Sequence, residues 1–307
     1  MKILFVSLGC DKNLVDSEKM LGMLQEKGYT FTDDEAEADV VVVNTCCFIG
    51  DAKEESINTL LQMGELKDSG QVKALIAAGC LAQRYREEIQ KEIPQVDAII
   101  GTTAIDEIVA ALEEILAGQK QNHYEDINAA PVTETNRVVT TGGHFAYLKI
   151  AEGCDNCCTY CIIPKLRGKF RSRPIDELVS EAKTLEGLGV KELVLVAQDT
   201  SRYGEDLYGE YSLAKLIRAV TDNTEIPWIR ILYCYPDKIT DELIEEFKNN
   251  SRLVNYIDIP IQHISDSVLK RMNRHGGSAV IRDAVGRLRK NVPGIVIRTT
   301  AIVGFPG

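Results

Sequence analysis

Three cysteines within one short segment carry the strongest chemical signal in the sequence. Cys154, Cys158 and Cys161 follow the spacing C-x-x-x-C-x-x-C. Each iron of a cubane 4Fe–4S cluster has one position for an outside ligand, so four cysteines normally saturate the cluster. Three cysteines leave one iron open, and an open metal position can bind a substrate instead of only passing electrons. The segment therefore predicts a cluster with one reactive iron.

Two other interpretations of this segment are weaker. Cys157 allows the pairs Cys154/Cys157 and Cys158/Cys161 to be taken as zinc knuckles. Paired knuckles need a long connection to place four sulfurs around one ion, and here the pairs abut. A disulfide framework belongs to small secreted proteins, and nothing else in the chain has that character. We therefore favour the cluster, and we expect Cys157 to be a small buried neighbour outside the ligand set.

The composition places the chain among soluble globular proteins. Its 307 residues suffice for about two domains, with 45% hydrophobic and 26% charged residues. The net charge of -11 argues against general binding of nucleic-acid phosphates and favours a basic partner. Nine cysteines without secretory features indicate a reducing compartment. Since no run approaches the ~18 apolar residues of a membrane span, we expect a cytoplasmic protein without a membrane segment.

The first half of the chain alternates strands with helices, which predicts a parallel sheet covered on both faces. The predicted strands are 3–8, 39–45, 73–79 and 98–101, and the helices that follow them are 15–27, 54–66, 82–92 and 105–117. A cysteine comes directly after each of the first three strands: Cys10, Cys46 and Cys80. Because the carboxyl ends of parallel strands lie along one edge, we expect these cysteines to converge. Gly9 and Gly79 would let a bulky inorganic group approach the backbone there.

For any one of these cysteines the simpler interpretation is a small buried side chain. Three in register favour a shared inorganic group, with Cys47 turned away in a structural role. Beyond residue 118 the alternation stops in a segment rich in Gly, Asn and Thr. We therefore expect a first domain at 1–118 and a linker at 119–143, in which 137–140 is a candidate for a short edge strand.

Residues 144–307 predict a partial (β/α) barrel whose active face lies at the carboxyl ends of its strands. The predicted strands are 146–151, 192–197, 228–233, 256–260 and 295–302, and the helical stretches are 175–188, 213–221, 241–249, 267–272 and 280–291. The chain ends on the fifth strand, so we expect the barrel to lack its last unit. The alternating basic residues from Lys165 to Arg173 are expected to form a solvated strand face.

The cysteine motif of the second half resembles the signature of the radical S-adenosylmethionine (SAM) superfamily. Three segments of the first half, 7–18, 43–46 and 78–84, are similar to the N-terminal domain of the methylthiotransferases. This resemblance implies an auxiliary 4Fe–4S cluster on Cys10, Cys46 and Cys80 and a radical SAM cluster on Cys154, Cys158 and Cys161. It also implies an α/β fold with a parallel-sheet domain before the barrel, and a C-terminal TRAM domain that this chain lacks.

In radical SAM enzymes the open iron chelates SAM, whose reductive cleavage yields a 5′-deoxyadenosyl radical. In methylthiotransferases the auxiliary cluster holds the sulfur, and a second SAM supplies the methyl group. An electron donor of unknown identity is implied as well. SAM contacts are expected from Tyr160, Gln198, Gln262 and Arg298, although polar groups at barrel ends also satisfy backbone groups.

The segments 7–18, 161–168 and 197–204 resemble the branch that modifies an aspartate β-carbon of the twelfth small-subunit ribosomal protein. The acidic charge agrees with a basic ribosomal substrate. Two alternatives stay open at this stage. One is a methylthiotransferase acting on adenosine of transfer RNA, which alone would involve nucleic acid. The other is a non-catalytic iron–sulfur or metal-binding module.

Overall fold

The computed structural model describes residues 1–132 and 136–307, which divide into two compact units. The first unit contains Met1–Thr140 together with Lys165–Gly168, and the second contains Thr141–Pro164 and Lys169–Gly307. A short piece that follows the second cysteine motif in sequence thus belongs to the first unit. Among the described residues, no helix combines the length and the apolar character that crossing a bilayer requires.

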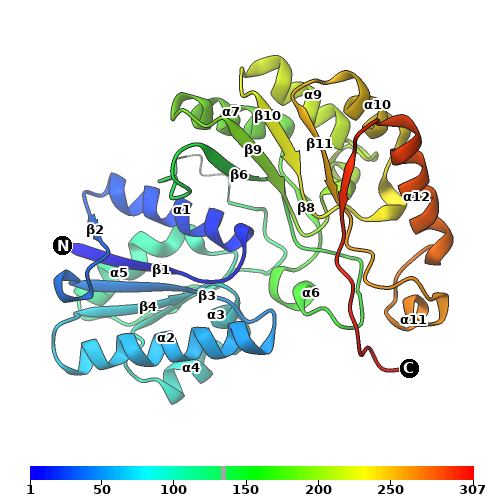
Figure 1. The fold of residues 1–307 in the computed structure, drawn as a ribbon. Helices are drawn as coiled ribbons and strands as arrows, with labels where there is room; N and C mark the ends of the chain where they lie inside the picture. The colour runs from blue at the N-terminus through cyan, green and yellow to red at the C-terminus, as the bar shows by residue number, and fades with distance from the viewer. Residues whose placement is uncertain (133–135) are drawn as a thin grey trace. The chain divides into compact units, whose positions relative to one another are not determined.

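The first unit contains a parallel sheet with the strand order β2-β1-β3-β4-β5 (Figure 1). Its strands are β1 (Lys2–Ser7), β2 (Thr30–Thr32), β3 (Val40–Thr45), β4 (Ala74–Ala78) and β5 (Ala98–Ile100). The register aligns Ser7, Asn44 and Ala78 across the three central strands. β3 is buried along its whole length, as expected for a strand covered on both faces.

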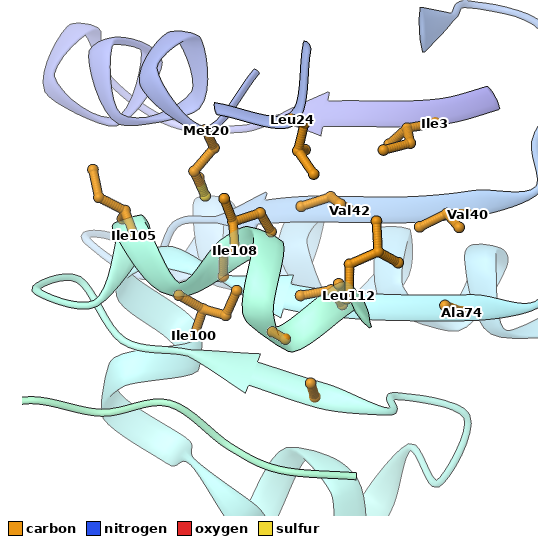
Figure 2. Close-up of a cluster of buried hydrophobic side chains, with 14 of the residues drawn as sticks. Ile3, Met20, Leu24, Val40, Val42, Ala74, Ile100, Ile105, Ile108 and Leu112 are labelled. Atoms are coloured by element: carbon orange, nitrogen blue, oxygen red, sulfur yellow. The ribbon is translucent and has the colours of Figure 1, made fainter. Parts of the chain in front are cut away.

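Helices cover both faces of this sheet. They are α1 (Asp11–Glu26), α2 (Gly50–Asp68), α3 (Gly79–Tyr85), α4 (Glu87–Glu92) and α5 (Ile108–Leu116), with short 3-10 turns η1 (Glu35–Glu37) and η2 (Ile105–Glu107). Figure 2 shows Met20 and Leu24 of α1 and Leu112 of α5 around Val40 and Val42 of β3. Successive residues of a strand point to opposite faces of the sheet. The other two valines of β3, Val41 and Val43, therefore face the side on which α2 packs.

Three local features of this unit differ from the sequence predictions. The short edge strand β2 was not predicted, and the helix predicted at 82–92 is broken in two at Arg86, whose φ is +45°. The candidate edge strand at 137–140 does not form. Instead Arg137 is buried and pairs with Glu18 of α1, with 3.5 Å between Nε and Oε2. A buried guanidinium needs a charged partner, and this need outweighs the local preference for a strand.

The second unit contains five parallel strands in the order β12-β11-β10-β9-β6. They are β6 (Phe145–Lys149), β9 (Glu192–Val196), β10 (Trp228–Ile231), β11 (Leu253–Asp258) and β12 (Val296–Arg298). The helices between them are α7 (Ile175–Gly187), α9 (Leu213–Asn223), α10 (Asp241–Asn249) and α12 (Gly277–Asn291). Strands that follow each other along the chain are neighbours in this sheet. When each connection between such parallel strands is right-handed, the connecting helices all lie on one face of the sheet. The predicted fold class, a parallel-sheet α/β domain followed by a partial (β/α) barrel, is confirmed.

Shorter elements occupy the loops of the second unit. β7 (Ala151–Glu152) and β8 (Arg171–Ser172) pair antiparallel. The others are α6 (Ile163–Arg167), α8 (Glu205–Tyr208), α11 (Asp266–Arg271), η3 (Thr200–Arg202) and η4 (Pro236–Lys238). α6 begins in the second unit and ends in the piece that belongs to the first.

The prediction of a solvated basic strand at 165–173 was wrong for Arg167 and Arg173, while Lys165 and Lys169 are exposed as expected. Lys165 and Arg167 lie on α6, and Arg167 and Arg173 are 2% and 1% exposed. Arg173 forms an ion pair with Glu181, with 2.7 Å between Nη1 and Oε2, and donates from Nη1 to the Lys149 carbonyl at 3.0 Å. A guanidinium that is paired in this way can be buried, and the alternation of charges along the sequence does not reveal its partners.

The two leucines of α5 test the packing of the first unit. We expect Leu112→Ala, at a fully buried site, to lower the opening free energy of the surrounding sheet by about 2–5 kcal/mol because it leaves a cavity. Leu116→Ala, on the exposed side of the same helix, should change it by less than about 0.5 kcal/mol. Native-state hydrogen exchange of peptides from β3 and β4 measures both. Equal effects would contradict the assignment of Leu112 to the core.

Candidate functional site

The first cysteine triplet lies at one edge of the first unit's sheet. Cys10 precedes α1, Cys46 follows β3 directly, and Cys80 lies in the first turn of α3. The strands that lead to them, β1, β3 and β4, are immediate neighbours in the sheet. Since adjacent strands are about 4.8 Å apart, their three ends span roughly 10 Å. The structure thus brings the three cysteines to one edge, and their binding of a metal stays a prediction.

The glycines beside these cysteines lie in close contact with neighbouring strand ends. Gly9 has a φ of +95°, and a Cβ there would lie 2.8 Å from Cβ and 2.9 Å from Sγ of Cys46. A Cβ on Gly79 would lie 2.6 Å from the Thr45 carbonyl oxygen. Close packing of the protein thus already requires glycine at both positions, and the approach of an inorganic group to them stays a prediction. They allow the ends of neighbouring strands to approach each other closely.

Three thiols at one sheet edge are the kind of donor set that an iron–sulfur cluster takes, and their binding of a cluster stays a prediction. Among the described residues, no three His, Cys, Asp or Glu side chains close around one metal ion. Thiolates on one zinc, each about 2.3 Å from the metal, would lie roughly 4 Å apart. The cysteines of a cubane bind different irons and are therefore spaced more widely.

A hydrogen-bond network fixes the turns that carry Cys10 and Cys46. Asn13 Nδ2 donates to the carbonyls of Leu8 at 2.7 Å and Thr45 at 3.2 Å. Asn44 Nδ2 donates to the Asn13 carbonyl at 2.9 Å and to Ser17 Oγ at 2.8 Å. The start of α1 is thereby tied to the ends of β1 and β3. The sequence prediction missed this network, although buried polar residues at positions i, i+3 and i+4 of a helix are a signal for one.

Arg167 is the second feature that the sequence prediction missed. Its Nη1 lies 2.7 Å from Asp16 Oδ2, and its Nη2 donates to Asn13 Oδ1 at 2.8 Å. The same Nη2 lies 3.4 Å from Cys80 Sγ. A buried positive charge therefore sits against one sulfur of the triplet.

Burial and this charge act in opposite directions on the thiols. Burial raises the pKa of Cys80 to about 12, and the guanidinium of Arg167 offsets part of that rise. Burial also raises the pKa of Cys46. A cysteine must lose its proton to bind a metal, so a metal at this edge has to displace protons that burial holds in place. Cys47, whose Sγ donates to the Cys80 carbonyl at 3.3 Å, is buried beside them.

The second triplet lies in the loop that follows β7. Cys154, Cys158 and Cys161 are partly exposed, and burial raises the pKa of Cys154 to about 12 and also raises that of Cys161. Cys157 is exposed, so the expectation that it is buried was wrong. Its backbone adopts a φ of +50°, and its carbonyl accepts from Asn273 Nδ2 at 3.0 Å. This turn places the side chain on the solvent side of the loop.

Tyr235 and Arg274 join the second triplet without having been predicted. The Tyr235 hydroxyl lies 2.9 Å from Cys158 Sγ, and the Arg274 guanidinium carbon lies 3.8 Å from the centroid of the Tyr235 ring. Burial raises the pKa of Tyr235 above its ordinary value. The hydroxyl therefore keeps its proton and can donate to a thiolate at Cys158. Its position beyond the carboxyl end of β10 was the available signal.

Gln198 has the best-defined surroundings among the predicted SAM contacts. Its Nε2 donates to Glu152 Oε1 at 2.6 Å, and Glu152 Oε2 lies 2.8 Å from Lys149 Nζ. The Oε1 atom of Gln198 is buried and has no hydrogen-bond partner among the described residues. A buried acceptor without a partner is costly, and a donor group of a ligand would satisfy it.

The other three predicted contacts have looser surroundings. Arg298 ends β12 and pairs with Asp258 at 3.1 Å, with its side chain 55% exposed. Gln262, beyond β11, adopts a φ of +67°. Tyr160 lies in the cysteine loop, edge-on to Phe305 with 6.4 Å between ring centroids, and burial raises its pKa. All three lie in the cysteine loop or at the carboxyl side of a strand, and their contact with SAM stays a prediction.

Strained backbone accompanies this edge of the second unit. Of the five described non-glycine residues with positive φ, four lie in its loops: Cys157, Tyr233, Gln262 and Asn273. Such conformations cost on the order of 1–3 kcal/mol each, and they persist only where the surrounding structure holds them, as is common at functional sites. The strain therefore marks the same loops that carry the sulfur and polar groups.

The sequence matches two family models that together cover most of the chain. Residues 2–101 match the model described as Uncharacterized protein family UPF0004, and residues 148–307 match the Radical SAM superfamily. The chain is 55% identical to a protein of Lachnoclostridium phytofermentans named ribosomal protein uS12 methylthiotransferase RimO, over 100% of this chain and 70% of the relative. The protein of the same name from Trichlorobacter lovleyi is 53% identical, over 100% of this chain and 68% of that relative.

Solved structures of radical SAM enzymes share the fold. The methyltransferase TsrM from Kitasatospora setae, with cobalamin and a 4Fe–4S cluster bound, aligns with a TM-score of 0.67 at 12% identity, covering 100% of this chain and 70% of that one. The cobalamin-dependent enzyme OxsB aligns with a TM-score of 0.64 at 13% identity, covering 98% and 49%. At this identity the similarity supports the fold alone.

The accessibility of the apo thiols tests the geometry of the first triplet. We expect Cys80 in metal-free folded protein to be alkylated at pH 8 at least a hundredfold more slowly than in urea, because burial and a raised pKa remove its thiolate. Cys10, which is exposed, serves as the internal control and should react in the folded state. Differential alkylation followed by mass spectrometry gives both rates. Fast labelling of Cys80 in the folded chain would contradict its placement.

Proposed function

Since the chain belongs to the radical SAM methylthiotransferases that modify ribosomal protein uS12, we propose that it attaches a methylthio group to the β-carbon of an aspartate in that protein. Membership of the family implies SAM and a 4Fe–4S cluster. We extend this to two clusters, one on each cysteine triplet. The observation that carries the proposal is the arrival of Cys10, Cys46 and Cys80 at the ends of three adjacent strands.

In the second unit Cys154, Cys158 and Cys161 would hold the radical SAM cluster. When bound and reduced, that cluster supplies the electron that cleaves SAM to a carbon radical able to break an unactivated C–H bond. Tyr235 keeps its proton and donates toward Cys158, while Arg274 stacks on its ring. Gln198 offers its buried Oε1 to a donor group of SAM, and Glu152 fixes the amide in that orientation. Tyr160, Gln262 and Arg298 complete the proposed SAM contacts.

In the first unit Cys10, Cys46 and Cys80 would hold the auxiliary cluster, whose open iron position suits a sulfur ligand. The chain's own contribution is a rigid edge. Asn13 and Asn44 tie the turns to the strands, and burial excludes water from two of the three sulfurs. Thiols that are buried and protonated without metal make cluster loading and folding interdependent.

The substrate assignment agrees with the charge of the chain. A net charge of -11 attracts a basic ribosomal protein and repels the phosphates of transfer RNA. We propose a cytoplasmic location as well, because the proposed substrate is a ribosomal protein. An electron donor is a necessary partner, because SAM cleavage consumes one electron.

The central test is anaerobic reconstitution followed by reaction with purified uS12. We expect about eight iron atoms per chain, corresponding to two cubanes. With SAM and a reductant, uS12 should gain the mass of one methylthio group on an aspartate. Cys158→Ala and Cys80→Ala should each reduce iron to about four per chain and abolish that mass gain.

Two neighbouring cysteines provide matched controls for this test. Cys157→Ala changes an exposed cysteine of the same loop, and Cys47→Ala changes the buried neighbour of Cys46. Both variants should keep about eight iron atoms per chain. Loss of a cluster in either one would show that the ligands have been assigned wrongly. A mass gain on transfer RNA and none on uS12 would overturn the substrate.

A further inference from the structure

Arg167 is a buried cation that the two ligand sets do not explain. It lies in the piece Lys165–Gly168, which belongs to the first unit although it follows Cys161 closely in sequence. Its side chain is 2% exposed. The same piece is held by Thr102, whose Oγ1 donates to the Leu166 carbonyl at 2.9 Å. Removing a guanidinium from water costs free energy, so a buried arginine is expected to be paired with other groups or to have a function.

The guanidinium is fixed by two side chains of α1 that lie three residues apart. Asp16 accepts from Nη1 at 2.7 Å and Asn13 Oδ1 accepts from Nη2 at 2.8 Å. Asn13 is itself held by the hydrogen bonds that its side-chain amide donates to the Leu8 and Thr45 carbonyls. The Arg167 guanidinium therefore has little conformational freedom, and its Nη2 is directed to Cys80 Sγ at 3.4 Å. An arginine is suited to this position because its charge is permanent and its donors are planar.

The charge of Arg167 matters most when the triplet is deprotonated. Three thiolates around an iron–sulfur core, two of them on buried cysteines, carry net negative charge, and each added electron increases that charge. The reduction potential of such a cluster depends on net charge and on hydrogen bonds to its sulfurs. A fixed cation at one sulfur therefore favours the reduced form. The carboxylate of Asp16, 2.7 Å from the same guanidinium, weakens this effect.

We propose that Arg167 is a positioning residue of the auxiliary site, which orients the Cys80 sulfur and raises the reduction potential of the cluster, with Asp16 setting the size of the effect. The inference rests on the proposed auxiliary cluster. It also gives the segment 161–167 two roles. Cys161 is the last cysteine of the second triplet, and Arg167, six residues later at the end of α6, contacts Cys80 of the first triplet.

The experiment measures the midpoint potential of the auxiliary cluster alone. It uses the full chain reconstituted with iron and sulfide after replacement of the second triplet by alanine: Cys154, Cys158 and Cys161. We expect R167Q to lower the equilibrium constant for one-electron reduction about tenfold, which is about 59 mV. R167K, which keeps the charge, should recover most of this loss. D16N, which keeps the shape and removes the opposing carboxylate, should shift the constant in the opposite direction.

The opposite signs separate a charge effect from general damage to the fold. R137Q removes another buried arginine of the first unit, one that pairs with Glu18. It should leave the equilibrium constant for one-electron reduction within about twofold of the value for the chain with Arg137 intact. EPR-monitored redox titration gives the potentials, and iron content reports loading. If R167Q binds no cluster while R167K does, the requirement for the charge is supported.

Three results would overturn the inference. One is a change in midpoint potential in R167Q that is no larger than the change in R137Q. Another is a change in midpoint potential in D16N that has the same direction as the change in R167Q. The third is loss of the cluster in both Arg167 variants with an unchanged potential in D16N. Absence of any cluster in the chain with Arg167 intact would instead overturn the proposed function, and this inference with it.

Discussion

The parallel order of β1, β3 and β4 is the constraint on which the first unit depends. Parallel strands must end at the same edge, and these three are neighbours, so residues that follow them are brought together whatever their separation in sequence. Cys10, Cys46 and Cys80 occupy those positions. The helices that begin there, α1 and α3, carry the polar and sulfur groups onward without a long flexible loop. A rigid edge of this kind positions three side chains at little conformational cost.

Burial at this edge creates a chemical demand that the protein meets in two ways. Two of the three thiols are buried, and burial raises their pKa. Deprotonation then requires positive charge nearby, which a metal and Arg167 provide. The guanidinium is itself acceptable in the interior because Asp16 and Asn13 satisfy it. Sulfur, cation and carboxylate thus form one electrostatic unit.

The second unit reaches a similar result by a different route. One loop supplies all three cysteines through local spacing, and the barrel strands supply the groups around them. Tyr235 and Gln198 come from the loops after β10 and β9, which neighbour each other in the sheet. Positive φ values at Tyr233, after β10, and at Gln262, after β11, show that the loops at this edge are held in conformations that an unconstrained chain would avoid.

The sequence by itself determined the two triplets, the alternation of strands and helices, and hence the fold class, because spacing and periodicity are local properties of the chain. It did not determine that Arg167 and Arg173 are buried, that Cys157 is exposed, or that Gly9 packs against Cys46. Those outcomes depend on partners such as Asp16 and Glu181, whose distance in space no local pattern encodes. Only the tertiary structure, which brings such partners together, decided them.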